Sequence, residues 1–300
     1  MNTIRTWKLC TLALAMACAG PAFAQQSYPT PKAAGDALVD ALGTTRADAG
    51  KVATVLGANW RDYVPEGSVD RKDVDAFLAK YREQHKFLPT ASGHMMLAAG
   101  KEGWTLPVPL TKADGGWQFD LEAGKEEIRS RRIGRNELDV HEAVLAYHDA
   151  QMDYAERDRD GDGVLEYAQQ LVSTDGKHDG LYWADDDSGE ISPLGPLFGD
   201  DKPKGDYLGY HYKILKAQGE SAPGGPYGYM LGQDMSRGFA LVAWPAEYGE
   251  TGVMTVMIGP DGQVFERDLG AKTEDLVRAM GKYDPDSAWQ EVSDKPVANK

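Results

Sequence analysis

Residues 136–154 have the sequence "NELDVHEAVLAYHDAQMDY", and this stretch decides the class of fold. Apolar residues recur in it every three or four positions, which is the spacing of one face of an α-helix. They are Val140, Ala143, Val144, Tyr147, Ala150 and Tyr154. Asn136 stands ahead of them as a candidate N-cap. The pattern predicts a long helix that begins near residue 136 and packs one face on a core.

Short strands are predicted after this helix. Residues 209–219, "GYHYKILKAQG", alternate in polarity, and residues 238–249, "GFALVAWPAEYG", form an apolar run. Residues 252–270, "GVMTVMIGPDGQVFERDLG", are typical of a hairpin that turns at 259–262. The segment at 218–232 is expected to be a flexible loop. A long helix on a mostly antiparallel sheet is an α+β arrangement rather than a doubly wound one.

A separate helix-rich domain is predicted before the long helix. Residues 31–43 and 70–85 have helical spacing, and "WTLPVPLTKADGGWQFDL" at 104–121 has two apolar runs around a turn signal. We therefore expect an N-terminal α+β domain with a small antiparallel sheet at 25–130 and a C-terminal α+β domain at 131–300. The basic stretch "RSRRIGR" at 129–135 is expected to be an exposed joint between them.

The first 24 residues are typical of a secretory signal peptide. A short basic start precedes an apolar run at 9–19, and "PAFA" places small residues at a cleavage site after Ala24. The predicted location is the periplasm. The alternative is lipoprotein processing at Cys18, although Ala15 stands where a lipobox prefers a large aliphatic residue. No later stretch is long and apolar enough to predict a transmembrane helix.

Cysteine content and charge exclude several classes of function. Cys10 and Cys18 are the two cysteines, so cleavage after Ala24 removes every candidate for a disulfide, a thiolate metal site or a cysteine nucleophile. The formal net charge of −15 disfavours a nucleic acid as partner. The expected partner is an envelope protein or a small ligand.

One motif points to a metal. Residues 158–169, "DRDGDGVLEYAQ", follow the spacing of a calcium loop, in which oxygen ligands stand at positions 1, 3, 5, 7 and 9. The predicted ligands are Asp158, Asp160, Asp162, the Val164 carbonyl and Glu166. Position 12 is Gln169, which offers one neutral oxygen in place of a bidentate carboxylate, so weak calcium binding is expected. The acids at 184–190, "ADDDSGE", are an alternative source of ligands. In another interpretation the aspartates only cap turns.

The sequence gives little indication of a catalytic site. The sequence has no Gly-x-Ser-x-Gly elbow, no phosphate loop and no dinucleotide fingerprint. His178 stands beside Asp179, but adjacent residues need not face each other. No catalytic residue is predicted, and no organic cofactor.

Several longer motifs carry a family resemblance. They include "GWQFDLEAGKEEIRSRRIGRNEL", "DRDGDGVLEYA", "DGLYW", "SPLGPL", "APGGPYGY", "GFALVAWPAEYGETGVMT" and "DPDSAW". Together they resemble the domain-of-unknown-function 2950 family of bacterial secreted proteins, which implies a periplasmic protein and supplies no catalytic residues. The C-terminal half, with a long helix followed by "DGDGVLEYA" and strands, is also similar to the heads of pilin-like proteins.

These observations favour a non-enzymatic periplasmic module that binds a ligand or supports envelope assembly, with calcium as a stabilising ion. The alternative is a calcium-dependent hydrolase of envelope material, with its site near the Asp/Gly loop and His178.

Overall fold

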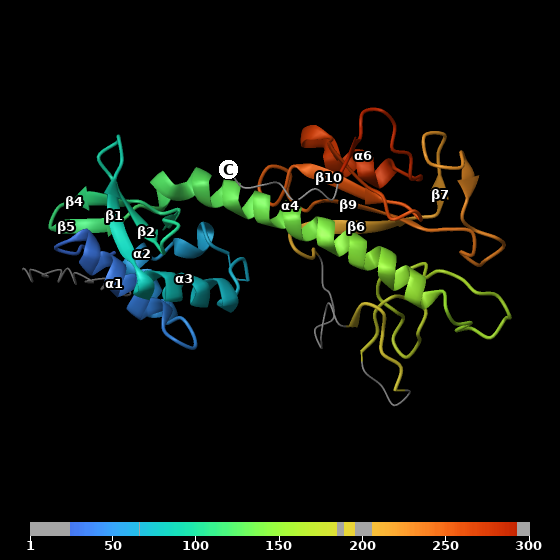
Figure 1. The fold of residues 1–300 in the computed structure, drawn as a ribbon, viewed down its shortest axis with the longest axis horizontal. Helices are drawn as coiled ribbons and strands as arrows, with labels where there is room; N and C mark the ends of the chain where they lie inside the picture. The colour runs from blue at the N-terminus through green and yellow to red at the C-terminus, as the bar shows by residue number, and fades with distance from the viewer. Residues whose placement is uncertain (1–24, 66, 185–188, 196–205, 293–300) are drawn as a thin grey trace, which may run out of the picture. The chain divides into compact units, whose positions relative to one another are not determined.

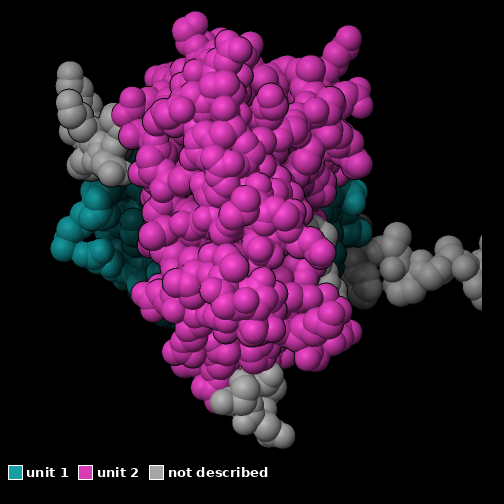
Figure 2. Space-filling view, turned by 90° about the vertical axis from the view of Figure 1, so that its right-hand side faces the viewer, with its two compact units in different colours: residues 1–125 teal, residues 126–300 magenta. Residues whose placement is uncertain are grey.

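The computed structural model describes residues 25–65, 67–184, 189–195 and 206–292. The chain divides into two compact units, Met1–Lys125 and Glu126–Lys300, which Figure 2 shows in different colours. The sequence placed this boundary at residues 130 and 131. The predicted signal peptide and Cys18 lie outside the described residues.

The described residues of the first unit form three α-helices, a 3₁₀ turn and a five-stranded antiparallel sheet, and the long helix that continues into the second unit begins there. The helical elements are α1 (Pro31–Leu42), α2 (Ala49–Leu56), η1 (Trp60–Asp62) and α3 (Arg71–Glu83). The strands are β1 (His85–Pro89), β2 (Met95–Ala99), β3 (Trp104–Thr105), β4 (Leu110–Ala113) and β5 (Gly116–Phe119). The sheet has the order β1-β2-β4-β5, with β3 also on β2. The predicted hairpin is confirmed, because Leu110 pairs with Phe119 across the turn.

Local sequence signals account for the helix ends in this unit. The Thr30 hydroxyl accepts a hydrogen bond from the backbone N–H of Ala33 at 3.1 Å, so it caps α1. Gly43 ends the same helix with a positive φ of 58°. Phe77 and Leu78 of α3 pack with Leu97 of β2 in a buried core.

The long helix, α4 (Leu121–Tyr154), begins fifteen residues before the predicted start at Asn136. The Asp120 carboxylate accepts a hydrogen bond from the backbone N–H of Ala123 at 2.9 Å and so caps the helix. Asn136 is buried inside α4, where its side-chain amide donates to the Thr251 carbonyl at 2.8 Å. The prediction of an N-cap at Asn136 was therefore wrong, and the basic stretch at 129–135 is helical rather than a joint.

The second unit has a five-stranded antiparallel sheet covered by helices. Its order is β12-β11-β10-β9-β6, and α4 runs along it in Figure 1. The strands are β6 (Tyr210–Leu215), β9 (Ala240–Pro245), β10 (Met254–Ile258), β11 (Val264–Asp268) and β12 (Gln290–Glu291). The predicted stripe is confirmed, because Val140, Val144 and Tyr147 are buried in this core.

A second helix explains why β9 is apolar throughout. The turn η2 (Gly270–Lys272) leads into α6 (Thr273–Ala279). Trp244 of β9 donates from its indole Nε1 to Glu274 of α6 at 2.6 Å, so this face of β9 lies under α6. Side chains alternate between the two faces of a strand. With a helix on each face, every residue of β9 is buried.

The segment at 218–232 is folded, although a flexible loop was expected. Strands β7 (Ala217–Gln218) and β8 (Tyr227–Gly228) pair antiparallel across it. The Gln218 amide donates to the carbonyls of Pro223 and Gly225 at 2.6 and 2.8 Å. Among the described helices, none combines the length and the apolar character needed to cross a membrane.

Candidate functional site

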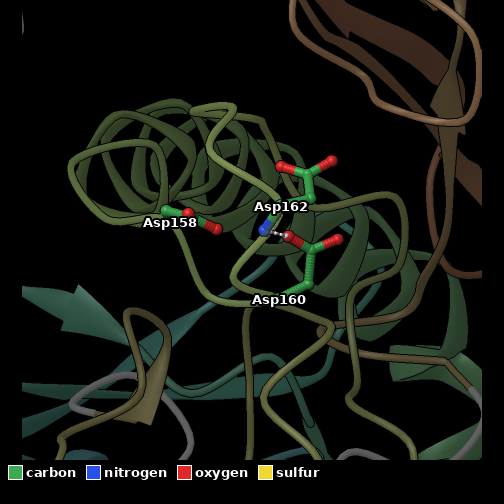
Figure 3. A group of neighbouring side chains, drawn as sticks. All are labelled: Asp158, Asp160 and Asp162. Atoms are coloured by element: carbon green, nitrogen blue, oxygen red, sulfur yellow. Dashed lines mark hydrogen bonds between the residues drawn. The ribbon is translucent and has the colours of Figure 1, made fainter.

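The Asp/Gly loop follows the end of α4 and is shaped by two glycines. Gly161 and Gly163 have φ values of 80° and 89°, a region that glycine enters without steric cost. They turn the chain so that Asp158, Asp160 and Asp162 approach one another (Figure 3). One carboxylate oxygen from each aspartate lies within 4.8 Å of the others, and all three residues are exposed.

The three carboxylates also bind the backbone of their own loop. Asp158 accepts from the N–H groups of Gly161 and Gly163 at 2.7 and 2.9 Å. Asp160 accepts from the N–H of Asp162 at 3.2 Å, the bond drawn in Figure 3. The hydrogen bonds from Gly163 and then Gly161 lower the pKa of Asp158. The aspartates therefore cap turns, and they also gather negative charge at one point.

The other two predicted ligands are the carbonyl of Val164 and the carboxylate of Glu166. Val164 donates its backbone N–H to Asp162 at 2.7 Å. Glu166 is half-buried and is not part of the group within 4.8 Å. Burial raises its pKa, and the charge of Asp160 adds to the effect. The carboxylates of Asp158, Asp160 and Asp162 thus come together, while Glu166 lies outside that group but is close enough for the charges of Asp160 and Asp162 to raise its pKa.

Gln169, at the twelfth position of the loop, forms hydrogen bonds with two residues that are distant in the sequence. Its amide nitrogen donates to the Gln233 carbonyl at 2.7 Å, and its oxygen accepts from the Lys216 ammonium at 2.8 Å. The alternative acids at 184–190 were the other candidate for closing the metal shell. Residues 185–188 lie outside the described residues.

Arg159 and Glu190 form a second polar cluster. The Arg159 guanidinium bonds to Glu190 at 3.1 Å and to the Tyr154 carbonyl. It also lies over the Tyr154 ring, 4.3 Å from its centroid. Its side chain is only 10% exposed, so it turns away from the three aspartates and fastens the loop to the body of the unit.

His178 belongs to the same cluster. Its ring Nδ1 lies 3.2 Å from a Glu190 carboxylate oxygen, and the ring stacks on Trp183 with centroids 4.2 Å apart. The Tyr154 hydroxyl donates to the His178 backbone carbonyl at 3.0 Å rather than to its ring. Asp179, the neighbour in sequence, accepts from the Thr174 N–H instead. The carboxylate that contacts the His178 ring is therefore that of Glu190, twelve residues later in the sequence, and not that of Asp179.

A polar cavity of about 330 Å³ lies beside the Asp/Gly loop. Its lining includes Tyr154, Glu166, Gln169, Gln170, Asp179 and Lys216. This volume is at the lower end of the range of about 300–1,000 Å³ for ligand pockets, but the cavity is half open and its walls are mainly polar, whereas such pockets are enclosed and mostly apolar. Neither the cavity nor the Arg159–Glu190–His178 cluster was predicted from the sequence. No short motif indicates either one, because their residues come from separate segments of the chain.

The family comparison covers nearly the whole described chain. The family described as "Protein of unknown function (DUF2950)" matches residues 25–292. The chain belongs to this family. The resemblance drawn from the sequence motifs is thereby confirmed, and membership in the DUF2950 family carries no assigned activity. No curated protein and no solved structure matches the chain, so the similarity to pilin-like heads stays a prediction.

Proposed function

We propose that this DUF2950 protein is a non-enzymatic binding module of the periplasm whose C-terminal unit is stabilised by calcium. The observation that carries the proposal is the approach of the Asp158, Asp160 and Asp162 carboxylates to within 4.8 Å of one another. Calcium takes six to eight oxygen ligands from flexible loops, and a cation at this point offsets the mutual repulsion of the three charges. Glu166 and the Val164 carbonyl would supply further oxygens.

Thermal melting tests this proposal. With Gln169 at the twelfth position we expect a dissociation constant on the order of 0.1–1 mM. Binding to the folded state alone stabilises it by about 1.4 kcal/mol at ten times that concentration. Magnesium should stabilise less, because it holds its water and needs octahedral geometry.

Variants identify the site. Asp160→Asn and Asp162→Asn should abolish the calcium-dependent shift, whereas Asp153→Asn, an exposed acid of α4 outside the group, should retain it. An unchanged melting temperature of the original chain at several times the expected dissociation constant would show that the loop is only a turn.

Export through a cleaved signal is the second component of the proposal. It is supported by the basic start, the apolar run and the small residues before Gln25. Mass spectrometry of the exported protein should find Gln25 at the N-terminus. A lipid-modified Cys18 there would place the protein on a membrane surface and contradict this component.

The alternative function is a calcium-dependent hydrolase of envelope material. The observation in its favour is the 3.2 Å contact between His178 and Glu190, since a carboxylate that orients a histidine is part of many hydrolytic sites. Release of soluble fragments from isolated envelopes should then require His178 and Glu190. Equal release by the original chain and by His178→Ala would remove this alternative.

A further inference from the structure

Arg159 places a cation in the middle of the Asp/Gly loop. It stands between Asp158 and Asp160 in the sequence, so its side chain starts next to two of the three clustered carboxylates. An arginine side chain carries a permanent positive charge and binds carboxylates with two parallel hydrogen bonds. An unrestrained guanidinium at this position would therefore compete with a metal ion for the aspartates.

The Arg159 guanidinium is bound by other partners instead. It donates to a Glu190 carboxylate oxygen at 3.1 Å and to the backbone carbonyls of Tyr154 and Arg157. It also lies over the Tyr154 ring, and its side chain is 10% exposed. Among the described residues, its hydrogen bonds include none to the three aspartates of the loop.

Glu190 supplies the negative charge that balances Arg159 in this position. Its second carboxylate oxygen lies 3.2 Å from Nδ1 of His178, and its backbone carbonyl accepts from the Trp183 indole at 3.1 Å. The exposed Arg157 contacts the same Glu190 oxygen as Arg159 does, at 3.3 Å. Because both its side chain and its backbone have partners, Glu190 is fixed where it meets the guanidinium.

We propose that Glu190 controls the cation affinity of the Asp/Gly loop by holding Arg159 away from the three aspartates. The inference rests on the proposed function, since the cation is calcium. With Glu190 ionised, Arg159 is neutralised elsewhere and the carboxylates are open to calcium. Without that charge, the guanidinium turns to Asp158 or Asp160 and competes for their oxygens. Glu190 is thus a positioning residue, because it acts on the metal site through Arg159.

Calorimetric titration of calcium into the metal-free chain at low salt tests the inference. Glu190→Gln keeps the size of the side chain but removes its charge. We expect this variant to bind calcium about tenfold more weakly, which is the effect of one competing charge-assisted contact. Glu156→Gln is the matched control. It removes the same charge from an exposed position three residues before Arg159 and should bind within about twofold of the original chain.

A double substitution separates this mechanism from a loss of structure. Arg159→Gln removes the competing cation, so the double variant with Glu190→Gln should bind calcium within about twofold of Arg159→Gln alone. A purely structural role predicts further weakening, because the double variant loses more contacts than either single variant. Arg159→Gln alone should bind calcium at least as tightly as the original chain, and this result does not depend on the folding of Glu190→Gln. Thermal melts with a chelator check that each variant is folded.

The outcomes distinguish this inference from the proposed function. Equal calcium affinity of the original chain and Glu190→Gln would overturn the inference alone. A double variant that stays as weak as Glu190→Gln would do the same. Loss of calcium binding in Arg159→Gln would also overturn it, because Arg159 would then support the metal site rather than compete with the metal. If the original chain does not bind calcium, the proposed function fails and this inference fails with it.

Discussion

Asp36 of α1 carries a charge whose surroundings change on folding. Its carboxylate accepts from the Lys32 ammonium at 2.7 Å and from the Tyr81 hydroxyl at 2.8 Å. The bond from Lys32, supported by the one from Tyr81, lowers the pKa of Asp36 below its ordinary value. A carboxyl group with a lower pKa in the folded state stabilises the fold above its unfolded pKa. That contribution is lost as the pH falls through the folded pKa.

We therefore predict that Asp36→Asn lowers the free energy of unfolding at neutral pH but not in acid. The Asp36 side chain is 48% exposed, so solvent screening limits the loss to about 1 kcal/mol or less. Urea denaturation of both chains between pH 7 and pH ~3 measures the difference, which should shrink below about pH 4. A constant difference over that range would mean that the carboxylate charge has no part in it.

Residues differ in how far the sequence reveals their roles. The approach of Asp158, Asp160 and Asp162 was predictable, because alternation with two glycines brings them together within one turn. Gln169 was expected to face the same point. It instead bonds Gln233 and Lys216, which are 64 and 47 residues away. Such distant partners leave no local signal, so they emerge only from the fold.

The first half of α4 is an element that the sequence pattern did not predict. The sequence has no apolar stripe between 121 and 135, and both Asp120 and Asn136 are residue types that favour an N-cap. Ion pairs stabilise the helix in this segment. The Arg131 guanidinium donates at 2.7 Å to the carboxylate of Glu127, which lies one turn earlier. Arg132 reaches Glu250 at 2.9 Å. The periodicity of apolar residues predicts helical segments that have a buried face. It does not predict helical turns that are stabilised by ion pairs.

Two glycines of α4 should respond in opposite ways to alanine. A Cβ on Gly134 would meet nothing within 4 Å, so Gly134→Ala should raise stability by about 0.5–1 kcal/mol. A Cβ on Gly124 would lie 2.5 Å from the Pro107 carbonyl oxygen, so Gly124→Ala should cost about 1–3 kcal/mol. Thermal melts of the two variants compare them directly. Destabilisation by both substitutions would argue against a regular helix through residue 134.

The molecule as a whole contains separate cores in its two units. The core of the first unit includes Leu97 of β2, which is completely buried. The core of the second unit includes Phe239, which is also completely buried and meets the Tyr147 ring edge-on at 5.8 Å. Each unit also has its own five-stranded antiparallel sheet. Each unit is thus a compact body with a core of its own.

We predict that a core substitution in one unit loosens that unit more than the other. Phe239→Ala should destabilise the second unit by about 3–5 kcal/mol, and Leu97→Ala the first by about 2–5 kcal/mol. Hydrogen exchange reports local opening in each region separately, because its free energy varies across a structure. Phe239→Ala should therefore accelerate exchange in β9 and β10 and leave β2 nearly unchanged, while Leu97→Ala should do the reverse.

The two variants control for each other, since each is a loss of buried volume in the same chain. Continuity of α4 across residues 125 and 126 is the one described feature that argues for shared unfolding. If either substitution accelerated exchange equally in β2 and β9, that helix would couple the two units into one cooperative structure. Faster exchange confined to the substituted unit would instead mean that α4 can fray near its charged first half without loss of either core.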